Sequence, residues 1–376
     1  MSSRTNPSKP KIIAFVIVLI LFPIFALVGL ELTARVAISL MYGVPGKSYG
    51  IFQSDPVLGH FPAPNTYNHF TSQNDHGFRN NRDVIEPRPK GAKRIVTYGG
   101  STTFCPKLTT EACWSGQLQK RLQAGDGNTD HQVLNGGVVL WSLGHALERA
   151  RRELPSLRPD MVIIYSGFNE PSNAIHLKTA GTPIEKLVAE GKFSVAAANY
   201  PASNWLHYYS ILYKISRAVV VSGLDHFKPP VASTPAGQAA KPVSEPDSQK
   251  TGTAPRRFVN PAVLKNYLVT LERFVKLVRD NGAEPIFVIQ ASAADFSPIY
   301  SELGAKTACD LGVRVLDARK AVADYPGDKA DLFRSKIHYS ATGTSEFARY
   351  LHEYLFKREG YSVCNGYQAP TYEPAS

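Results

Sequence analysis

The stretch from Arg94 to Thr103, RIVTYGGSTT, carries the pattern that decides the fold. A short run with strand character ends at two glycines, and a serine and a helix-like segment follow. Glycine permits the sharp turn, partly at positive φ, that carries a chain out of a buried strand. The pattern predicts that Ser101 lies at the carboxyl edge of a sheet, near a helix N-terminus, where a developing oxyanion is favoured. Taken alone, such a serine is equally typical of a turn residue that caps a helix.

Three later blocks of sequence accompany this serine in a fixed order. They are NGGVVLWS at 135–142, YSGFNE at 165–170 and HYSATG at 338–343. The first two follow short apolar runs, at 132–134 and 161–164, as the strand ends of a parallel sheet should. Ligand sites of open α/β sheets gather at these carboxyl ends, so this edge is the expected place of a site.

Strand-like and helix-like segments alternate along the rest of the chain. The expected strands are 94–98, 132–135, 161–166, 285–291 and 313–317, and the expected helices are 112–124, 144–154, 260–280, 298–311 and 341–356. Alternation of this kind predicts an α/β fold in which helices cover both faces of a central parallel sheet.

The four blocks together resemble the SGNH/GDSL hydrolase superfamily over roughly residues 94 to 357. The resemblance implies a three-layer α/β/α, flavodoxin-like fold and a serine esterase without cofactor or metal. It implies that Ser101 is the nucleophile and His338 the general base. It also implies an oxyanion hole formed by Ser101, Leu140 and Asn169. A serine hydroxyl is a weak nucleophile until an imidazole within hydrogen-bond reach accepts its proton.

Two positions depart from the pattern of that superfamily. Ser335 stands where the family usually has an aspartate, three residues before the histidine, that holds the imidazole tautomer. A serine can accept a hydrogen bond from the ring, but it cannot stabilise an imidazolium as a carboxylate does. Asp331 is the alternative orienter. Asp317, at the end of the last strand, is expected to be structural, with contact to His338 as the alternative. Leu140 stands where a glycine is usual, and its β-carbon restricts the turn.

The first 45 residues indicate membrane attachment. Ile12 to Leu30 is a run of nineteen residues without a charge, long enough to cross a bilayer core of about 30 Å. Three basic residues precede the run, so the positive-inside rule predicts a cytoplasmic N-terminus and a catalytic domain on the periplasmic or extracellular side. A cleavable signal peptide is the alternative. Its apolar core is normally about 7 to 15 residues, and residues 33–37 match a cleavage site poorly.

The remaining chain is expected to form one domain with an extension and an insertion. Residues 46–93 are loop-rich and are expected to pack on the hydrolase domain, 94–376. The insertion, 171–258, begins beside the active site. Apolar and aromatic residues at helical spacing over 205–221 predict a helix that covers the core, with a substrate lid or a membrane-facing surface as alternatives. Residues 228–257 are rich in proline and poor in large apolar side chains, so they should be disordered.

The chain is basic, with a formal net charge of +11. No basic stripe interleaved with aromatic residues is present, so nucleic acid is not an expected partner. Attraction to anionic lipid headgroups or to an acidic envelope polymer is expected instead. His60 and His76 have neither the spacing nor the accompanying carboxylates of a metal site.

The four cysteines, Cys105, Cys113, Cys309 and Cys364, lack metal-ligand spacing. In an oxidising compartment they can form two disulfides with three possible pairings, of which Cys105 with Cys113 would close a short loop just after Ser101. Four buried free thiols are the alternative.

These observations predict a membrane-anchored, extracytoplasmic serine esterase. Its substrate would be an acylated carbohydrate or lipid of the cell envelope, from which it cleaves or transfers a small acyl group such as acetyl. One alternative is a carbohydrate-binding protein on the same fold whose catalysis has decayed, as Ser335 and Leu140 suggest. Another is an assembly protein whose envelope partner binds the 171–258 insertion. Fold alone does not choose among them.

Overall fold

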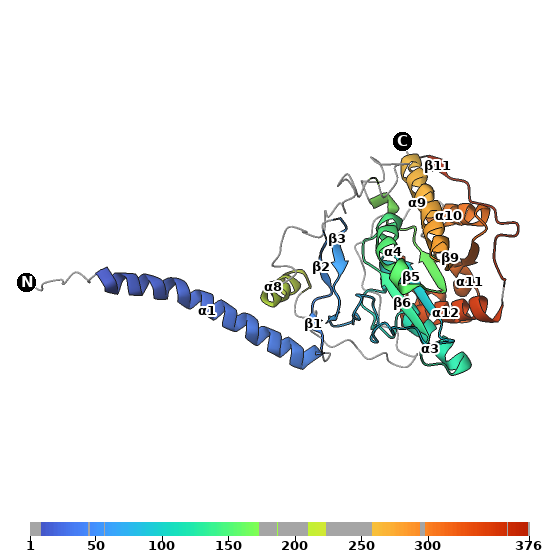
Figure 1. The fold of residues 1–376 in the computed structure, drawn as a ribbon. Coiled ribbons are helices and arrows are strands. Elements are labelled where there is room, and N and C mark those ends of the chain that lie inside the picture. The colour runs from blue at the N-terminus through green and yellow to red at the C-terminus, as the bar shows by residue number, and fades with distance from the viewer. Residues whose placement is uncertain are drawn as a thin grey trace, which may run out of the picture.

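The computed structural model describes residues 9–43, 46–55, 57–172, 186, 210–222, 258–293, 298–358 and 360–374. Figure 1 shows a long N-terminal helix that extends away from a sandwich of helices around a sheet. The sheet strands are β5 (Arg94–Gly99), β6 (Gln132–Gly137), β7 (Met161–Tyr165), β9 (Glu284–Ile289) and β10 (Arg314–Asp317). Their order is β10-β9-β7-β5-β6, and every neighbouring pair is parallel. The expected α/β fold with a central parallel sheet is therefore confirmed.

Helices cover both faces of this sheet because successive strand residues point to opposite sides. On β5, Val96 belongs to an apolar cluster with α4 (Leu143–Leu157), α9 (Pro261–Asp280) and α10 (Ile299–Asp310). Its neighbour Ile95 belongs to a second cluster with α3 (Trp114–Asp126) and α12 (Ala341–His352). The five expected helices are all present, and they form the two outer layers of the sandwich (Figure 1).

Two short helical segments near the C-terminus differ from the expectation. Helix α11 (Ala318–Ala323) directly follows β10 and was not predicted. The Asp317 carboxylate caps it by accepting a hydrogen bond from the backbone N–H of Arg319 (2.9 Å), so Asp317 has the expected structural role. The predicted helix 341–356 ends as an α-helix at His352 and continues as a π-helical turn, η4 (Glu353–Lys357).

The segment before the sheet contains two small strand pairs. The first is β1 (Ser48–Tyr49) with β4 (Thr66–Tyr67), and the second is β2 (Phe52–Asp55) with β3 (Gly59–Pro62). Leu58 and Phe78 are fully buried in the same cluster as α4 and α9. The backbone N–H of Arg79 donates to the carbonyl of Asn135 on β6 (2.9 Å), so this segment packs directly on the sandwich. A last pair joins β8 (Phe258–Val259) to β11 (Glu373–Pro374).

Helix α1 (Lys9–Tyr42) contains a candidate membrane span over Val16–Met41, with mean hydropathy 2.6. Ile38 is buried, and nearly all other residues of the span are exposed. Its length and composition are those of a spanning helix, and a signal sequence shares them.

Helix α8 (Ile211–Ser222) packs against α1 through the carboxylate of Glu31. That carboxylate accepts hydrogen bonds from the backbone N–H groups of Ile211 (2.8 Å) and Leu212 (3.1 Å) and from the hydroxyl of Ser210 (3.0 Å). A carboxylate at this position satisfies free N–H groups of a helix N-terminus. The expectation that this helix covers the core was wrong, because its strongest packing partner among the described elements is α1. Residues 205–209 and 228–257 lie outside the described residues.

Both disulfides are present. Cys105 bonds to Cys113, and Cys309 bonds to Cys364. The alternative of four free thiols was therefore wrong, and Cys105–Cys113 closes the loop that follows Ser101.

Candidate active site

Ser101 lies at the carboxyl end of β5, as predicted, and begins the four-residue helix α2 (Ser101–Phe104). The two preceding residues, Gly99 and Gly100, must be glycine because no space is left for a β-carbon. A β-carbon on Gly99 would lie 2.1 Å from the carbonyl oxygen of Tyr165, and one on Gly100 would lie 2.5 Å from Nδ2 of Asn169. Gly100 has a φ of −89°, so the predicted positive-φ turn was wrong here. Close packing of strand ends, rather than backbone strain, accounts for the glycine pair.

The imidazole of His338 contacts Ser101 directly. Its Nε2 lies 2.9 Å from the Ser101 Oγ, although the two residues are 237 positions apart in the sequence. On the other side of the ring, Nδ1 lies 2.9 Å from the Ser335 Oγ. A proton on Nδ1 that is donated to Ser335 leaves Nε2 free to accept the proton of Ser101. The Ser335 Oγ also accepts from the backbone N–H of His338 (3.2 Å), which fixes the hydroxyl beneath the ring.

Among the described residues, no carboxylate contacts this imidazole. The Asp317 carboxylate is bound by Arg319, with Nη2 at 2.7 Å. Asp331 is exposed in the turn η3 (Lys329–Leu332), where its backbone carbonyl accepts from Ser340. The structure thus places Ser335, and neither aspartate, at the ring.

The surroundings of His338 disfavour its charged form. Burial and, to a smaller extent, the positive charges of Arg334 and Lys107 together lower the pKa of His338 to about 4. The imidazole is therefore neutral, and able to accept a proton, above about pH 4. The effect of these two cations was not predicted, although Arg334 precedes His338 by only four residues.

The residues expected in the oxyanion hole lie around the same turn. Nδ2 of Asn169 donates to the carbonyl of Trp141 (2.9 Å), which fixes the amide beside Gly100. A primary amide has two N–H groups, so the second can serve another acceptor. Leu140 has a φ of +65° and a side chain that is 49% exposed. It therefore adopts the left-handed conformation that suits the glycine usual at this position.

Glu170, the last residue of the YSGFNE block, stabilises this arrangement, a role that was not predicted for it. Its Oε1 accepts from the backbone N–H of Leu143 (3.0 Å) and from the hydroxyl of Ser166 (3.1 Å). It therefore links the end of β7 to the start of α4 and holds the adjacent Asn169 in place. Burial raises the pKa of Glu170 above its ordinary value.

Leu140→Gly is expected to increase the free energy of unfolding by up to about 1 kcal/mol. A left-handed L-residue costs roughly 1–2 kcal/mol, and glycine loses about 0.5–1 kcal/mol more in folding entropy. Little burial is lost, because the leucine is half-exposed. Denaturant unfolding measures the change. Leu140→Ala, which keeps the β-carbon, is the matched control and should give no such gain. Equal stability of the two variants would contradict the conclusion that the left-handed backbone of Leu140 is strained.

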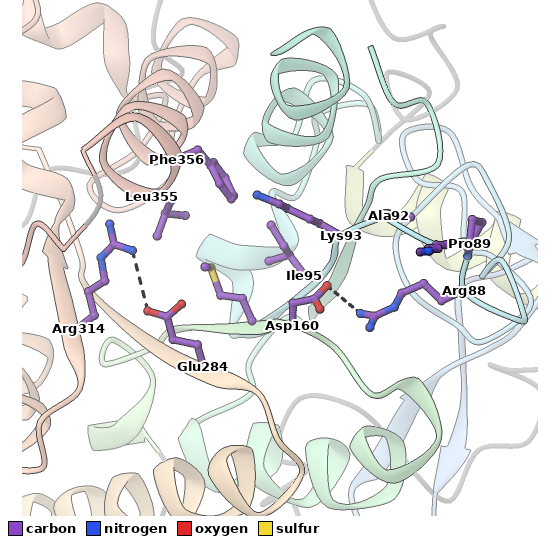
Figure 2. Close-up of a pocket in the computed structure, with 13 residues that line it drawn as sticks. Arg88, Pro89, Ala92, Lys93, Ile95, Asp160, Glu284, Arg314, Leu355 and Phe356 are labelled. Carbon is purple, nitrogen blue, oxygen red and sulfur yellow. Dashed lines mark hydrogen bonds and ion pairs between the residues drawn. The ribbon is translucent and has the colours of Figure 1, made fainter. Parts of the chain in front are cut away.

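A separate cavity of about 700 Å³ lies at the opposite edge of the sheet, where the strands begin (Figure 2). Ion pairs between Arg88 and Asp160 (2.7 Å) and between Arg314 and Glu284 (3.9 Å) border it. Ser101 follows the other end of β5, so this cavity takes no part in the Ser101–His338 geometry.

No protein-family model matches the sequence, and no curated protein does. Several solved structures are similar in fold. They include the esterase EstA from Pseudoalteromonas sp. (13% identity, 71% of this chain and 98% of that chain, TM-score 0.40). Axe2, an acetylxylan esterase from Geobacillus stearothermophilus, has 16% identity over 70% of this chain and 94% of its own (TM-score 0.40). A GDSL-like lipase from Bacteroides thetaiotaomicron has 11% identity over 72% and 92% (TM-score 0.37). All three are named as an esterase or a lipase, and each match has low sequence identity.

Proposed function

We propose that this chain is a serine esterase of the SGNH/GDSL superfamily, anchored in a membrane by α1 with its catalytic domain outside the cytoplasm. Its substrate is a small acyl ester, such as an acetyl ester, of an envelope carbohydrate or lipid. One observation supports the proposal above all others: Nε2 of His338 lies 2.9 Å from the Oγ of Ser101 at the carboxyl end of β5. Two disulfides support an oxidising compartment.

In the proposed reaction, the Ser101 Oγ attacks the ester carbonyl carbon while Nε2 of His338 accepts the hydroxyl proton. The bond to the alcohol oxygen then breaks, His338 returns the proton to that oxygen, and an acyl-serine remains. Water, activated by His338 in the same way, releases the acid and restores Ser101. An acceptor hydroxyl in place of water would make the second step an acyl transfer.

The oxyanion of the tetrahedral intermediate needs donors that are already in position. We assign this role to the backbone N–H groups of Ser101 and Leu140 and to the side-chain amide of Asn169. Each such donor typically contributes about 3 kcal/mol to the stability of the transition state. The bond from Asn169 to Trp141 supports the assignment, because it restricts the amide to one orientation.

Labelling with a fluorophosphonate tests the proposal. The reagent should modify the wild-type chain at Ser101, as peptide mapping would report, and should modify neither Ser101→Ala nor His338→Ala. The presence of Ser335 at the ring, where a carboxylate is usual, favours a second candidate, a binding or assembly protein on the same fold. An unlabelled wild-type chain would support that candidate and refute the esterase.

The anchor is expected to remain uncleaved, since the apolar run is longer than a signal-peptide core. The full-length chain should stay in the membrane fraction after a carbonate wash, and a reporter active only in the periplasm should be active when fused after Ser376. A soluble product that begins near Ser39 would show that the helix is a signal peptide. A cytoplasmically active reporter would reverse the topology.

A further inference from the structure

The guanidinium of Arg334 has fewer partners than those of the buried arginines. The guanidinium groups of Arg94 and Arg149 each pair with a glutamate, at 2.6 Å and 2.8 Å, and that of Arg79 donates to backbone carbonyls. Arg334 is half-buried, its Nε is buried without a hydrogen-bond partner, and no carboxylate pairs with it in the described part of the chain. A half-buried cation without a counter-ion is costly. Proteins commonly keep such an unpaired cation where a bound ligand supplies the negative charge that compensates it.

The position of Arg334 is fixed beside the catalytic imidazole. Its backbone N–H donates to the carbonyl of His338 (3.0 Å), across a turn closed by a bridge between Phe333 and Tyr339. A small hollow is lined by Thr102, Cys105, Arg334, His338, Tyr339 and Thr344. Arg334 and the residue that follows Ser101 therefore share one surface.

A second cation approaches the same imidazole from another loop. Lys107 is exposed at a φ of +59°, within the loop closed by the Cys105–Cys113 disulfide. Arg79 holds this loop through a hydrogen bond to the carbonyl of Cys105 (2.6 Å) and a second one to the carbonyl of Leu108. Cys105, at the start of this loop, lines the hollow together with Arg334 and His338. The disulfide and the contacts of Arg79 therefore hold the loop that carries Lys107 at the edge of the hollow, and the charge of Lys107 acts on His338 as that of Arg334 does.

We propose that Arg334 and Lys107 form a subsite for an anionic oxygen group, a carboxylate or a phosphodiester, on the alcohol side of the ester substrate. The inference rests on the proposed esterase function and specifies its substrate class. A guanidinium and an ammonium together can bind such a group through charge-assisted hydrogen bonds. The bound anion would also lie near His338 and stabilise the imidazolium that forms during attack. Ser335 is neutral and cannot provide this stabilisation. The anion should therefore increase kcat as well as lower KM.

Matched small esters test the subsite on the full-length chain. The probes are 3-acetoxybenzoate, neutral 3-acetoxybenzamide and the methyl phosphodiester of 3-acetoxyphenol, each normalised to its hydroxide-catalysed rate. Charge-assisted hydrogen bonds typically give preferences of about 10- to 100-fold. We expect wild type to prefer an anionic ester over the benzamide by this factor, and the preference to shrink as salt is added. The carboxylate and phosphodiester arms show which anion the site takes.

Arg334→Gln should reduce the anionic-to-neutral ratio towards one, and Lys107→Gln, at an exposed position, should reduce it less. Arg334→Lys keeps the charge and should retain part of the ratio. Arg88→Gln, at the opposite edge of the sheet, is the control and should leave it unchanged. A wild-type ratio near one with Ser101-dependent cleavage of the benzamide would overturn the subsite and leave the esterase intact.

Binding of 3-hydroxybenzoate and of 3-hydroxyphenyl methyl phosphate, measured by ligand-observed NMR, gives a readout independent of turnover. Binding of either product that Arg334→Gln weakens at least tenfold would support the subsite even if no ester were cleaved. If the products bind but no ester is cleaved, only the proposed esterase function is contradicted, and the subsite is not. Absence of both binding and anionic preference would overturn the subsite.

Discussion

Ser101→Ala is expected to lower kcat/KM for a short-chain aryl ester by about 10³-fold or more. The reason is that, among the described residues, Ser101 carries the only hydroxyl within hydrogen-bond distance of Nε2 of His338 (2.9 Å). The Ser101 hydroxyl has no other hydrogen-bond partner among the described residues, so the melting temperature should change by no more than about 2 °C. Initial rates with 4-nitrophenyl acetate and a thermal unfolding curve measure both effects on the same protein.

The control for this loss is Ser156→Ala, which removes an exposed serine hydroxyl on α4. It should leave the rate unchanged. Ser101→Ala and wild type with equal rates would refute the assignment of the nucleophile. A parallel loss of rate and melting temperature would mean that the effect is structural.

Ser335→Asp is expected to raise kcat by roughly tenfold or more. Removal of the orienting aspartate from a complete triad costs up to about 10⁴-fold, so a chain that lacks this carboxylate should be slow. Ser335 lies 2.9 Å from Nδ1 of His338, so a carboxylate introduced there can reach the same nitrogen. It would stabilise the imidazolium that forms when Ser101 gives up its proton.

The same substitution should change the pH dependence in a definite direction. The wild-type base is neutral above about pH 4, because burial and two nearby cations lower the pKa of His338. The acidic limb of kcat/KM should therefore lie near pH 4, with the rate rising as pH increases. A carboxylate favours the protonated ring, raises the pKa and moves this limb to higher pH. Rate profiles from pH 3.5 to 9 would show the shift.

Ser335→Asn is the matched control, because it has the size of aspartate without its charge. It should neither raise kcat nor move the limb. Ser335→Ala should cost less than about tenfold, since a neutral hydrogen bond contributes about 0.5–1.5 kcal/mol. If Ser335→Asp were neutral while Asp331→Ala abolished the rate, Asp331 would be the orienter in solution and the arrangement described here would be wrong.

The sheet was predictable from the sequence because buried parallel strands are continuous apolar runs. The segments 132–135 and 161–166 needed only small changes at their ends. The His338–Ser335 contact followed from a spacing of three residues in one turn. Longer-range features carried no such local signal. The contact of Glu31 with α8 joins residues 180 positions apart. The lack of a carboxylate partner for Arg334 among the described residues likewise depends on how distant segments pack.

The disulfide pairing and the glycine pair illustrate two other limits. Four cysteines allow three pairings, and only the distances in the folded chain choose among them. The glycines before Ser101 signalled a turn correctly, but the sequence could not tell whether backbone conformation or space was the constraint. The 2.5 Å that would separate a Gly100 β-carbon from Asn169 makes space the constraint there.

The cap that Glu31 forms on α8 has a mechanical consequence. Helix α1 is connected to the rest of the protein at two points. Its C-terminal end leads into β1, and its Glu31 carboxylate binds the first backbone N–H groups of α8. A domain held by a single linker swivels freely about its anchor, whereas a domain held at two points does not. The Lys214 ammonium of α8 donates in turn to the carbonyl of Tyr49 on β1 (3.3 Å), so α8 joins α1 to the segment that precedes the sheet and restricts the swivelling of that segment about α1.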